Sequence, residues 1–218
     1  NRPNYAEFLK SLNSKKVLYS HNDPISMIGS KSALERKELI RSCAKIIFNS
    51  EWSKKRFFIG LDNFLLNSEK VEVIYQSTNK KKININKKKK LITFVGKLNK
   101  SKGYDLFGEA ILKILNEFKD WEAVVFGDEL REKISFEHER LINMGYKSNN
   151  EVLKVLEKTS IAVACSRWAE PFGRSSLEAS SRGCAVIISN KGGLPETITD
   201  GIILKHLTAS DIYKNIKN

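Results

Sequence analysis

Two glutamates frame a segment that could bind an anion. Glu170 and Glu178 lie eight positions apart. Between them, Pro171 should end any regular structure and Gly173 should let the chain turn into a helix reaching about residue 182. A helix start leaves backbone amides without partners, and these would belong to Phe172, Gly173 and Arg174. Such amides attract phosphate, and carboxylates accept hydrogen bonds from paired sugar hydroxyls. The spacing suits a nucleotide-sugar, although a surface glutamate at 178 and a capping glutamate at 170 fit the same residues.

A second candidate anion site is the loop 96–103, of sequence GKLNKSKG, which follows the apolar run 91–95. Gly96 and Gly103 would let the backbone turn tightly and approach a ligand. Lys97 and Lys102 would place positive charge where a diphosphate lies. The pattern matches neither of the common glycine-rich phosphate-binding motifs. A lysine-rich solvated turn is the alternative interpretation.

Alternating elements should bring these two segments together. After residue 90 the apolar runs predict strands at 91–95, 123–126, 161–164, 185–188 and 202–204. Helical spacing predicts helices at about 104–118, 149–158 and 173–182. This alternation predicts an α/β fold with a doubly wound parallel sheet, whose ligand lies at the carboxyl ends of the strands.

An earlier block repeats the pattern on a smaller scale. Strands are expected at 17–19, 46–48 and 71–75, with helices over 32–44 and from a cap at Ser50 to Gly60. Three strands suggest only the back part of a domain. We therefore predict a partial domain over 1–78, a lysine-rich linker over 79–90, and a ligand-binding domain over 91–218 that stops early. Since the sequence opens at Asn1 rather than Met, we expect its true beginning to be missing.

The formal net charge of +13 is carried largely by lysine. The densest run, residues 80–90, has seven lysines and no aromatic residue on which a base could stack. We interpret it as a solvated linker, with contact to an anionic membrane surface as the alternative, and expect no nucleic-acid partner. Three widely spaced cysteines, with no apolar run long enough to span a membrane, indicate reduced core thiols in the cytoplasm.

The order of motifs resembles one enzyme family. The segments VVFGD at 124–128, EPFGRSSLEA at 170–179 and NKGGLPE at 190–196 follow the lysine-containing loop. This series is similar to the C-terminal domain of glycosyltransferase family 4, which has the GT-B fold of two Rossmann-like domains and a Glu-x7-Glu signature. The resemblance covers residues 91–205 closely and 15–78 more loosely.

The resemblance implies roles for the donor-binding residues. Glu178 would hold the ribose hydroxyls, and Glu170 would lie at the donor sugar near its anomeric carbon. Amides at 172–174 would bind the sugar and the distal phosphate, beside Gly96. Lys97 and Lys102 would grip the diphosphate. The family usually has arginine at position 97, so this chain keeps the charge but loses the bidentate fork.

The resemblance also implies a histidine at the acceptor side. Tyr19 to Asn22 matches the strand end where the family often places one, which makes His21 the candidate near the reacting centre. A structural role for a lone histidine remains the alternative. Asp128 matches a Gly-Asp turn that we interpret as structural.

The implied reaction moves a sugar from a nucleotide-diphosphate donor to a hydroxyl acceptor with retained anomeric configuration. It would need no metal and no cofactor, and the leaving phosphate would help to deprotonate the acceptor. The expected acceptor is a glycan or lipid-linked glycan, with peripheral membrane contact as a further possibility. A related epimerase or phosphorylase, and a basic module binding polyanions or membranes, are the alternatives. We expect this part of the protein to bind donor better than it turns over.

Overall fold

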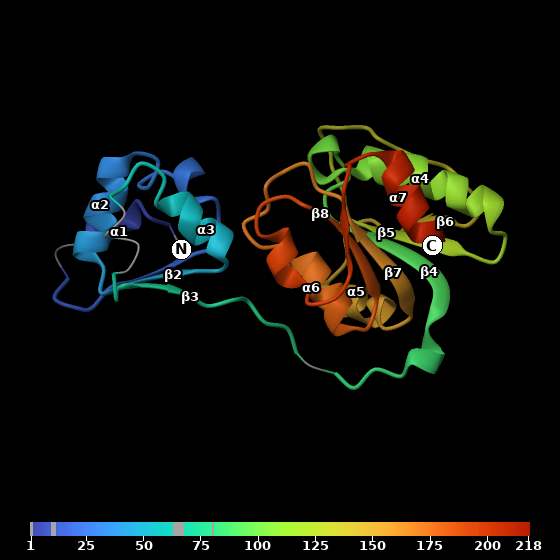
Figure 1. The fold of residues 1–218 in the computed structure, drawn as a ribbon, viewed down its shortest axis with the longest axis horizontal. Helices are drawn as coiled ribbons and strands as arrows, with labels where there is room; N and C mark the ends of the chain where they lie inside the picture. Colours follow the sequence, from blue (N-terminus) through green and yellow to red (C-terminus); the bar gives the residue numbers. More distant parts are fainter. Residues whose placement is uncertain (1, 10–11, 63–67, 80) are drawn as a thin grey trace. The chain divides into compact units, whose positions relative to one another are not determined.

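The computed structural model describes residues 2–9, 12–62, 68–79 and 81–218, which fall into two compact units (Figure 1). The first unit comprises Asn1–Gln76 with Glu170–Phe172, and the second comprises Ser77–Ala169 with Gly173–Asn218. This division assigns the lysine-rich segment to the second unit. It also assigns the tripeptide beginning at Glu170 to the first. Within the described residues, no helix is both long and apolar enough to cross a membrane.

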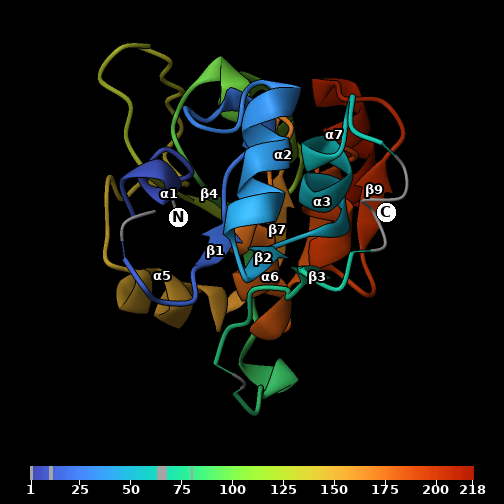
Figure 2. The ribbon, with the colours of Figure 1, turned by 90° about the vertical axis from the view of Figure 1, so that its left-hand side faces the viewer.

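The first unit has a small parallel sheet. Its elements are α1 (Tyr5–Phe8), β1 (Val17–Ser20), the 3-10 helix η2 (Pro24–Ser26), α2 (Ala33–Ser42), β2 (Lys45–Phe48), α3 (Glu51–Phe57) and β3 (Val71–Val73). The strands pair in the order β1-β2-β3. Figures 1 and 2 show α2 and α3 on one side of these strands. The buried apolar residues of this unit form one cluster: Leu18, Leu39, Ile40, Cys43, Ile46, Phe48, Phe57 and Phe58.

Serine caps begin α2 and α3 of this unit. Ser50 accepts a hydrogen bond from the Ser53 amide and caps α3, as its position before the charged helical stretch predicts. Ser32 and Glu35 form a reciprocal capping box at the start of α2. Because these caps satisfy amides that have no helical partner, the two helices can begin directly after a turn.

The second unit is a doubly wound sheet. Its strands are β4 (Lys89–Val95), β5 (Glu122–Phe126), β6 (Leu141–Asn143), β7 (Thr159–Ala164), β8 (Ala185–Ser189) and β9 (Ile202–Leu204). Its helices are η4 (Ile85–Lys87), η5 (Lys100–Lys102), α4 (Tyr104–Glu117), α5 (Asn149–Leu156), α6 (Arg174–Ser181), η6 (Leu194–Thr197) and α7 (Ala209–Lys217). The strand order is β6-β5-β4-β7-β8-β9, and all neighbours are parallel.

Helices cover both faces of this sheet. In Figure 1, α4 and α7 lie on one face, and α5 and α6 lie on the other. The first pair buries Phe107, Ile111 and Ile212 against β4 and β5, and the second pair buries Leu156 and Ala179. The predicted α/β fold with two parallel sheets is confirmed. The sequence patterns had missed β6 and α7, because β6 has only two apolar residues and α7 lies beyond the last recognised motif.

The lysine-rich segment is solvated but anchored to the second unit. Most of its lysines are exposed. Lys88 is an exception, since its Nζ donates to the carbonyls of Leu156, Thr159 and Arg182 at 3.1, 2.6 and 2.7 Å. Lys81 forms an ion pair with Glu157 at 2.7 Å. These contacts hold the segment along the ends of α5 and α6, so part of its charge is neutralised within the protein.

Candidate functional site

The site lies where the chain reverses its direction of winding through the second sheet. From β4 the chain runs outward through β5 and β6, then returns to place β7 on the other side of β4. The loops after β4 and β7 therefore leave neighbouring strands at the same carboxyl edge of the sheet. Such a switch point is where ligands bind in doubly wound folds. The structure brings the loop 96–103 and the start of α6 to this edge.

The loop after β4 is a tight 3-10 turn. Asn99 caps η5, with its Oδ1 accepting from the Lys102 amide at 3.0 Å. Gly103 has φ +75°, and a Cβ there would lie 2.0 Å from the Cys165 carbonyl oxygen, so only glycine fits. Gly96 does not have a positive φ. A Cβ added at Gly96 would lie 3.9 Å from the Lys102 Cγ, so the lysine stem passes close to this glycine. Lys97 is exposed, and Lys102 is half-buried as it passes over Gly96.

A pocket of about 260 Å³ opens beside this loop. Its walls come from the carboxyl ends of β4 and β5 and from the segment before α5: Val95, Gly96, Lys97, Phe126, Gly127, Asp128, Tyr146, Lys147 and Val152. Apolar side chains make up much of the lining, with two lysines and one aspartate among them. An apolar lining with a few charged groups suits a planar ring that carries a charged extension.

Glu178 is a buried carboxylate, not a surface helix residue. It is 5% exposed, and its Oε1 accepts hydrogen bonds at 3.0 Å from Asn149 Nδ2 and from Arg174. Arg174 lies one turn earlier on α6, at the i,i+4 spacing that favours such a pair. Among the described residues, none donates to Glu178 Oε2. One oxygen of the carboxylate is therefore held in place while the other is available to a ligand.

The start of α6 provides free backbone amides. Gly173 is its N-cap with φ +111°, and no side chain caps the helix. A Cβ at this position would lie 2.5 Å from Leu194 Cδ2, so the turn requires glycine. The predicted helix start at 173 is confirmed, and the Arg174 side chain adds a role that the sequence had not suggested, since it pairs with Glu178.

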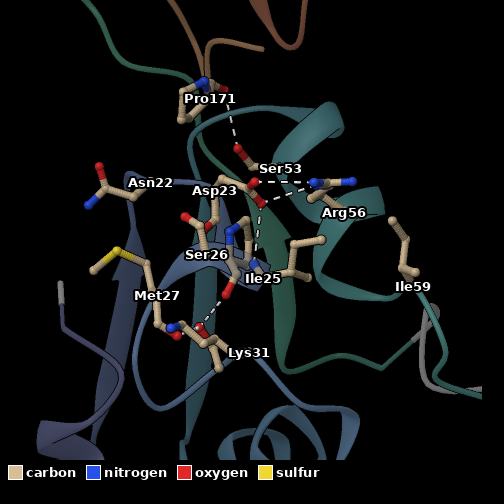
Figure 3. Close-up of polar contacts among 12 residues, drawn as sticks. Asn22, Asp23, Ile25, Ser26, Met27, Lys31, Ser53, Arg56, Ile59 and Pro171 are labelled. Carbon is tan, nitrogen blue, oxygen red and sulfur yellow. Dashed lines mark hydrogen bonds and ion pairs between the residues drawn. The ribbon is translucent and has the colours of Figure 1, made fainter. Parts of the chain in front are cut away.

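The tripeptide before α6 groups with the first unit. Pro171 accepts a hydrogen bond at its carbonyl from Ser50 at 2.5 Å. The same carbonyl accepts from Ser53 at 3.2 Å (Figure 3). Phe172 is buried, with its ring centroid 6.1 Å from that of Tyr75. Glu170 and Glu178 therefore belong to different units, although the sequence places them in one motif.

His21 follows β1, as the sequence had indicated. Gln76 donates from Nε2 to His21 Nδ1 at 2.9 Å, which leaves the ring proton on Nε2. The Tyr19 ring lies edge-on at 4.1 Å between centroids. Burial lowers the pKa of His21, so the imidazole is neutral near pH 7 and can donate through its Nε2–H.

An ion pair fixes the turn that carries His21. The carboxylate of Asp23 receives hydrogen bonds from Arg56 Nε and Nη2 at 3.2 and 3.3 Å (Figure 3). Asp23 also accepts from the Ile25 amide and caps η2. Because Asp23 is buried, this bidentate contact holds the turn after β1 against α3.

The structure adds three residues that the sequence analysis missed. Asn149 holds Glu178, Gln76 holds His21, and Tyr146 lines the pocket. The capping pattern of Ser148 and Glu151 marks the start of α5 and could have placed Asn149 at a helix end. No sequence signal could have paired Gln76 with His21, which lies 55 positions away. Among the described residues, no three acidic, histidine or cysteine side chains gather as a metal site would require.

Comparisons with known proteins identify the family of this chain. Residues 76–215 match the family described as "Glycosyl transferases group 1". Spore coat protein SA of Bacillus subtilis is 30% identical over 126 residues, which cover 52% of this chain and 33% of that protein. Lipopolysaccharide core biosynthesis mannosyltransferase LpsB of Rhizobium meliloti is 31% identical over 134 residues, covering 56% and 37%. The chain thus spans little more than a third of the length of these curated relatives.

Solved structures match over nearly the whole chain. Anabaena Alr3699/HepE in complex with UDP has a TM-score of 0.77 at 17% identity, covering 97% of this chain and 64% of that one. TarM has a TM-score of 0.76 at 16% identity, covering 99% and 46%. At these identities the likeness shows the fold alone, which is the GT-B fold with its two parallel sheets.

Proposed function

This chain belongs to the glycosyl transferases group 1 family, and we propose that it is part of a retaining glycosyltransferase that moves a sugar from a nucleotide-diphosphate-sugar to a hydroxyl acceptor. The observation that carries the proposal is the pocket beside Gly96 and Lys97, together with the buried carboxylate of Glu178 held by Asn149. Alr3699/HepE, which has a similar fold, was crystallised with UDP. That complex supports a nucleotide as the ligand.

The parts of the donor correspond to distinct groups of the site. The base would occupy the pocket against Tyr146, and Glu178 Oε2 would accept from the ribose hydroxyls. Lys97 and Lys102 would neutralise the diphosphate. The free amides at the start of α6 would bind its distal end. The contacts of Glu178 and of the two lysines would be hydrogen bonds that involve a charged group, the type worth about 1.5–3 kcal/mol.

The chemistry requires stabilisation of the departing diphosphate. As the bond to the sugar breaks, negative charge grows on the phosphate oxygen while the sugar becomes oxocarbenium-like. Lys97, Lys102 and the helix start would stabilise that charge without a metal or cofactor. Glu170 would lie near the sugar, and the neutral His21 would donate through Nε2–H at the acceptor side. The leaving phosphate would accept the proton of the acceptor hydroxyl, so the reaction needs no further base.

The acceptor and the location belong to the same proposal. LpsB is named for lipopolysaccharide core biosynthesis, which supports a glycan or lipid-linked glycan as acceptor. A cytoplasmic protein with a net charge of +13 would meet such an acceptor at the inner face of an anionic membrane.

A binding panel tests the donor site. Calorimetry with UDP, GDP, ADP and their sugars should show selective binding of one nucleotide. Glu178→Gln should weaken that binding by about tenfold or more, because it removes a charged acceptor from the ribose. Glu122→Gln is the matched control, since Glu122 is an exposed glutamate at the amino end of β5, on the opposite edge of the sheet.

The same panel separates the rival functions. Equal affinity for heparin and for every nucleotide, with a steep dependence on salt, would favour a polyanion-binding module. Selective binding that Glu178→Gln leaves unchanged would refute the assigned ribose contact.

A further inference from the structure

A side chain without a role in the proposed reaction links the two loops of the donor site. Arg167, in the loop after β7, donates from Nη1 and Nη2 to the two carboxylate oxygens of Asp105 at 2.6 and 2.7 Å. Its Nη1 also donates to the Lys100 carbonyl at 2.6 Å. Asp105 lies in the first turn of α4, directly after the loop 96–103. Arg167 therefore joins the carboxyl edge of β7 to both ends of the turn that follows β4.

Backbone contacts strengthen the same connection. The amides of Arg167 and Trp168 both donate to the Ser101 carbonyl, at 2.9 and 3.1 Å. The Ser166 hydroxyl lies 3.2 Å from the same oxygen. Cys165 Sγ donates to the Gly103 carbonyl at 3.2 Å. The successive carbonyls before and after Lys102 are thus held by one short segment, which fixes the backbone from which Lys102 projects.

The electrostatics favour a permanent pair. Burial alone would raise the pKa of Asp105, but the hydrogen bond and charge of Arg167 outweigh it and lower that pKa. Asp105 is thus ionised at neutral pH. Both protons of Arg167 Nη1 are used within the protein, so this nitrogen cannot also bind a phosphate. A partly exposed ion pair of this kind adds only about 0–1 kcal/mol to stability, which makes stability a weak reason for its geometry.

We propose that Arg167 and Asp105 are positioning residues that hold the loop 96–103 so that Lys97 and Lys102 meet the diphosphate of the donor. This inference rests on the proposed function, because it assigns the two lysines to a diphosphate. It extends that function to a pair of residues that do not touch the ligand. The bidentate geometry matters to the assignment, since an ammonium group cannot reproduce it.

Two conservative variants test the pair. Arg167→Lys keeps the positive charge but loses the fork, and Asp105→Asn keeps the size but loses the ion pair. Calorimetry would compare UDP, GDP and ADP with the corresponding monophosphates. We expect both variants to weaken the diphosphate bound by the wild type by about tenfold, through displaced lysines. Affinity for the monophosphate should fall less, by under about twofold, because a single phosphate presents less charge to the two lysines of the loop.

A double-mutant comparison asks whether Arg167 acts through Lys102. If it does, Lys102→Ala should cost less diphosphate affinity in the Arg167→Lys background than in the wild type. Additive losses would contradict the proposal. Asp120→Asn is the control, because it breaks the ion pair with Lys90 at the opposite edge of the sheet.

Hydrogen exchange gives a readout that needs no ligand. Amides in the peptide 97–105 should exchange faster in Arg167→Lys than in wild type or Asp120→Asn. Unchanged exchange and unchanged diphosphate affinity would overturn the positioning role while leaving the donor site intact. If the variants lost equal affinity for the diphosphate and the monophosphate, the Arg167–Asp105 pair would be a structural contact with no specific effect on the diphosphate. If the wild type bound none of the nucleotides, the proposed function would fail and the positioning role with it.

Discussion

At the residue scale, the polar groups of the site are each oriented by a neighbour. Asn149 and Arg174 hold Glu178, Gln76 holds His21, and Arg167 holds the backbone beside Lys102. An oriented side chain loses less conformational freedom when a ligand arrives. The supporting residues should therefore raise the affinity for a ligand by lowering the entropy lost on binding.

The neutral state of His21 predicts a dependence of stability on pH. Burial lowers its pKa in the folded chain, so the unfolded chain binds a proton more readily. The free energy of unfolding should be greatest above the unfolded pKa and fall as the pH drops toward the folded pKa. We expect the wild type to lose more stability than His21→Gln between about pH 7.5 and about pH 5.

Urea unfolding monitored through Trp52 measures this in the first unit. Trp121 and Trp168, which lie in the second unit, would be replaced by Phe. His206→Gln is the control for the loss of a histidine outside the first unit. Equal pH dependence in the wild type and His21→Gln would contradict the effect of burial.

At the element scale, the site depends on turns that only glycine can make. Gly103 lets the 3-10 turn pass directly into α4 while its backbone lies against the end of β7. Gly173, with its left-handed φ, lets the chain turn from the tripeptide directly into α6. These turns place the amino ends of α4 and α6 at the same edge of the sheet.

Gly103→Ala should therefore be costly for two reasons. The left-handed φ costs an alanine about 1–2 kcal/mol, and the added methyl would meet the Cys165 carbonyl, a backbone atom that cannot move cheaply. Gly145→Ala is the matched control, with φ +62° and nothing within 4 Å of the added atom. We expect Gly103→Ala to lose at least about 1 kcal/mol more than the control, measured by urea unfolding followed by circular dichroism. If both variants lost the same free energy of unfolding, the contact of the added methyl with the Cys165 carbonyl would contribute nothing to the cost.

At the scale of the whole molecule, two units carry separate cores. The three apolar clusters each draw their members from one unit, the first around Phe48 and the others around the sheet of the second. Separate cores allow each unit to unfold on its own. The residues to which the sequence analysis gave roles likewise divide, with His21 in the first unit and Glu178 in the second.

A core substitution should accordingly act on one unit. Phe48 is fully buried, and Phe48→Ala should destabilise the first unit by about 3–5 kcal/mol. Ile111→Ala, in α4, is the reciprocal variant of the second unit. Calorimetric scans should show one transition lowered by each variant and the other unchanged. A single transition shifted by both would show that the units unfold together.

The sequence by itself determined the class of the fold and pointed to most residues of the candidate site. Continuous apolar strands such as 91–95 predict a sheet covered on both faces, because alternation is lost when both sides are buried. Pro171 and Gly173 predicted the start of α6, and Lys97 and Lys102 indicated the loop after β4 as a candidate anion site. These signals are local, since turn residues and periodicity act over a few positions.

Only the tertiary structure decided which residues support the site. Glu178 accepts a hydrogen bond from Asn149, which is 29 positions away, and Arg167 reaches Asp105 across 62 positions. Partners at such separations are set by strand order, which no local pattern encodes. The assignment of Glu170 and Glu178 to different units was likewise hidden, because a spacing of eight residues says nothing about which core a turn packs against.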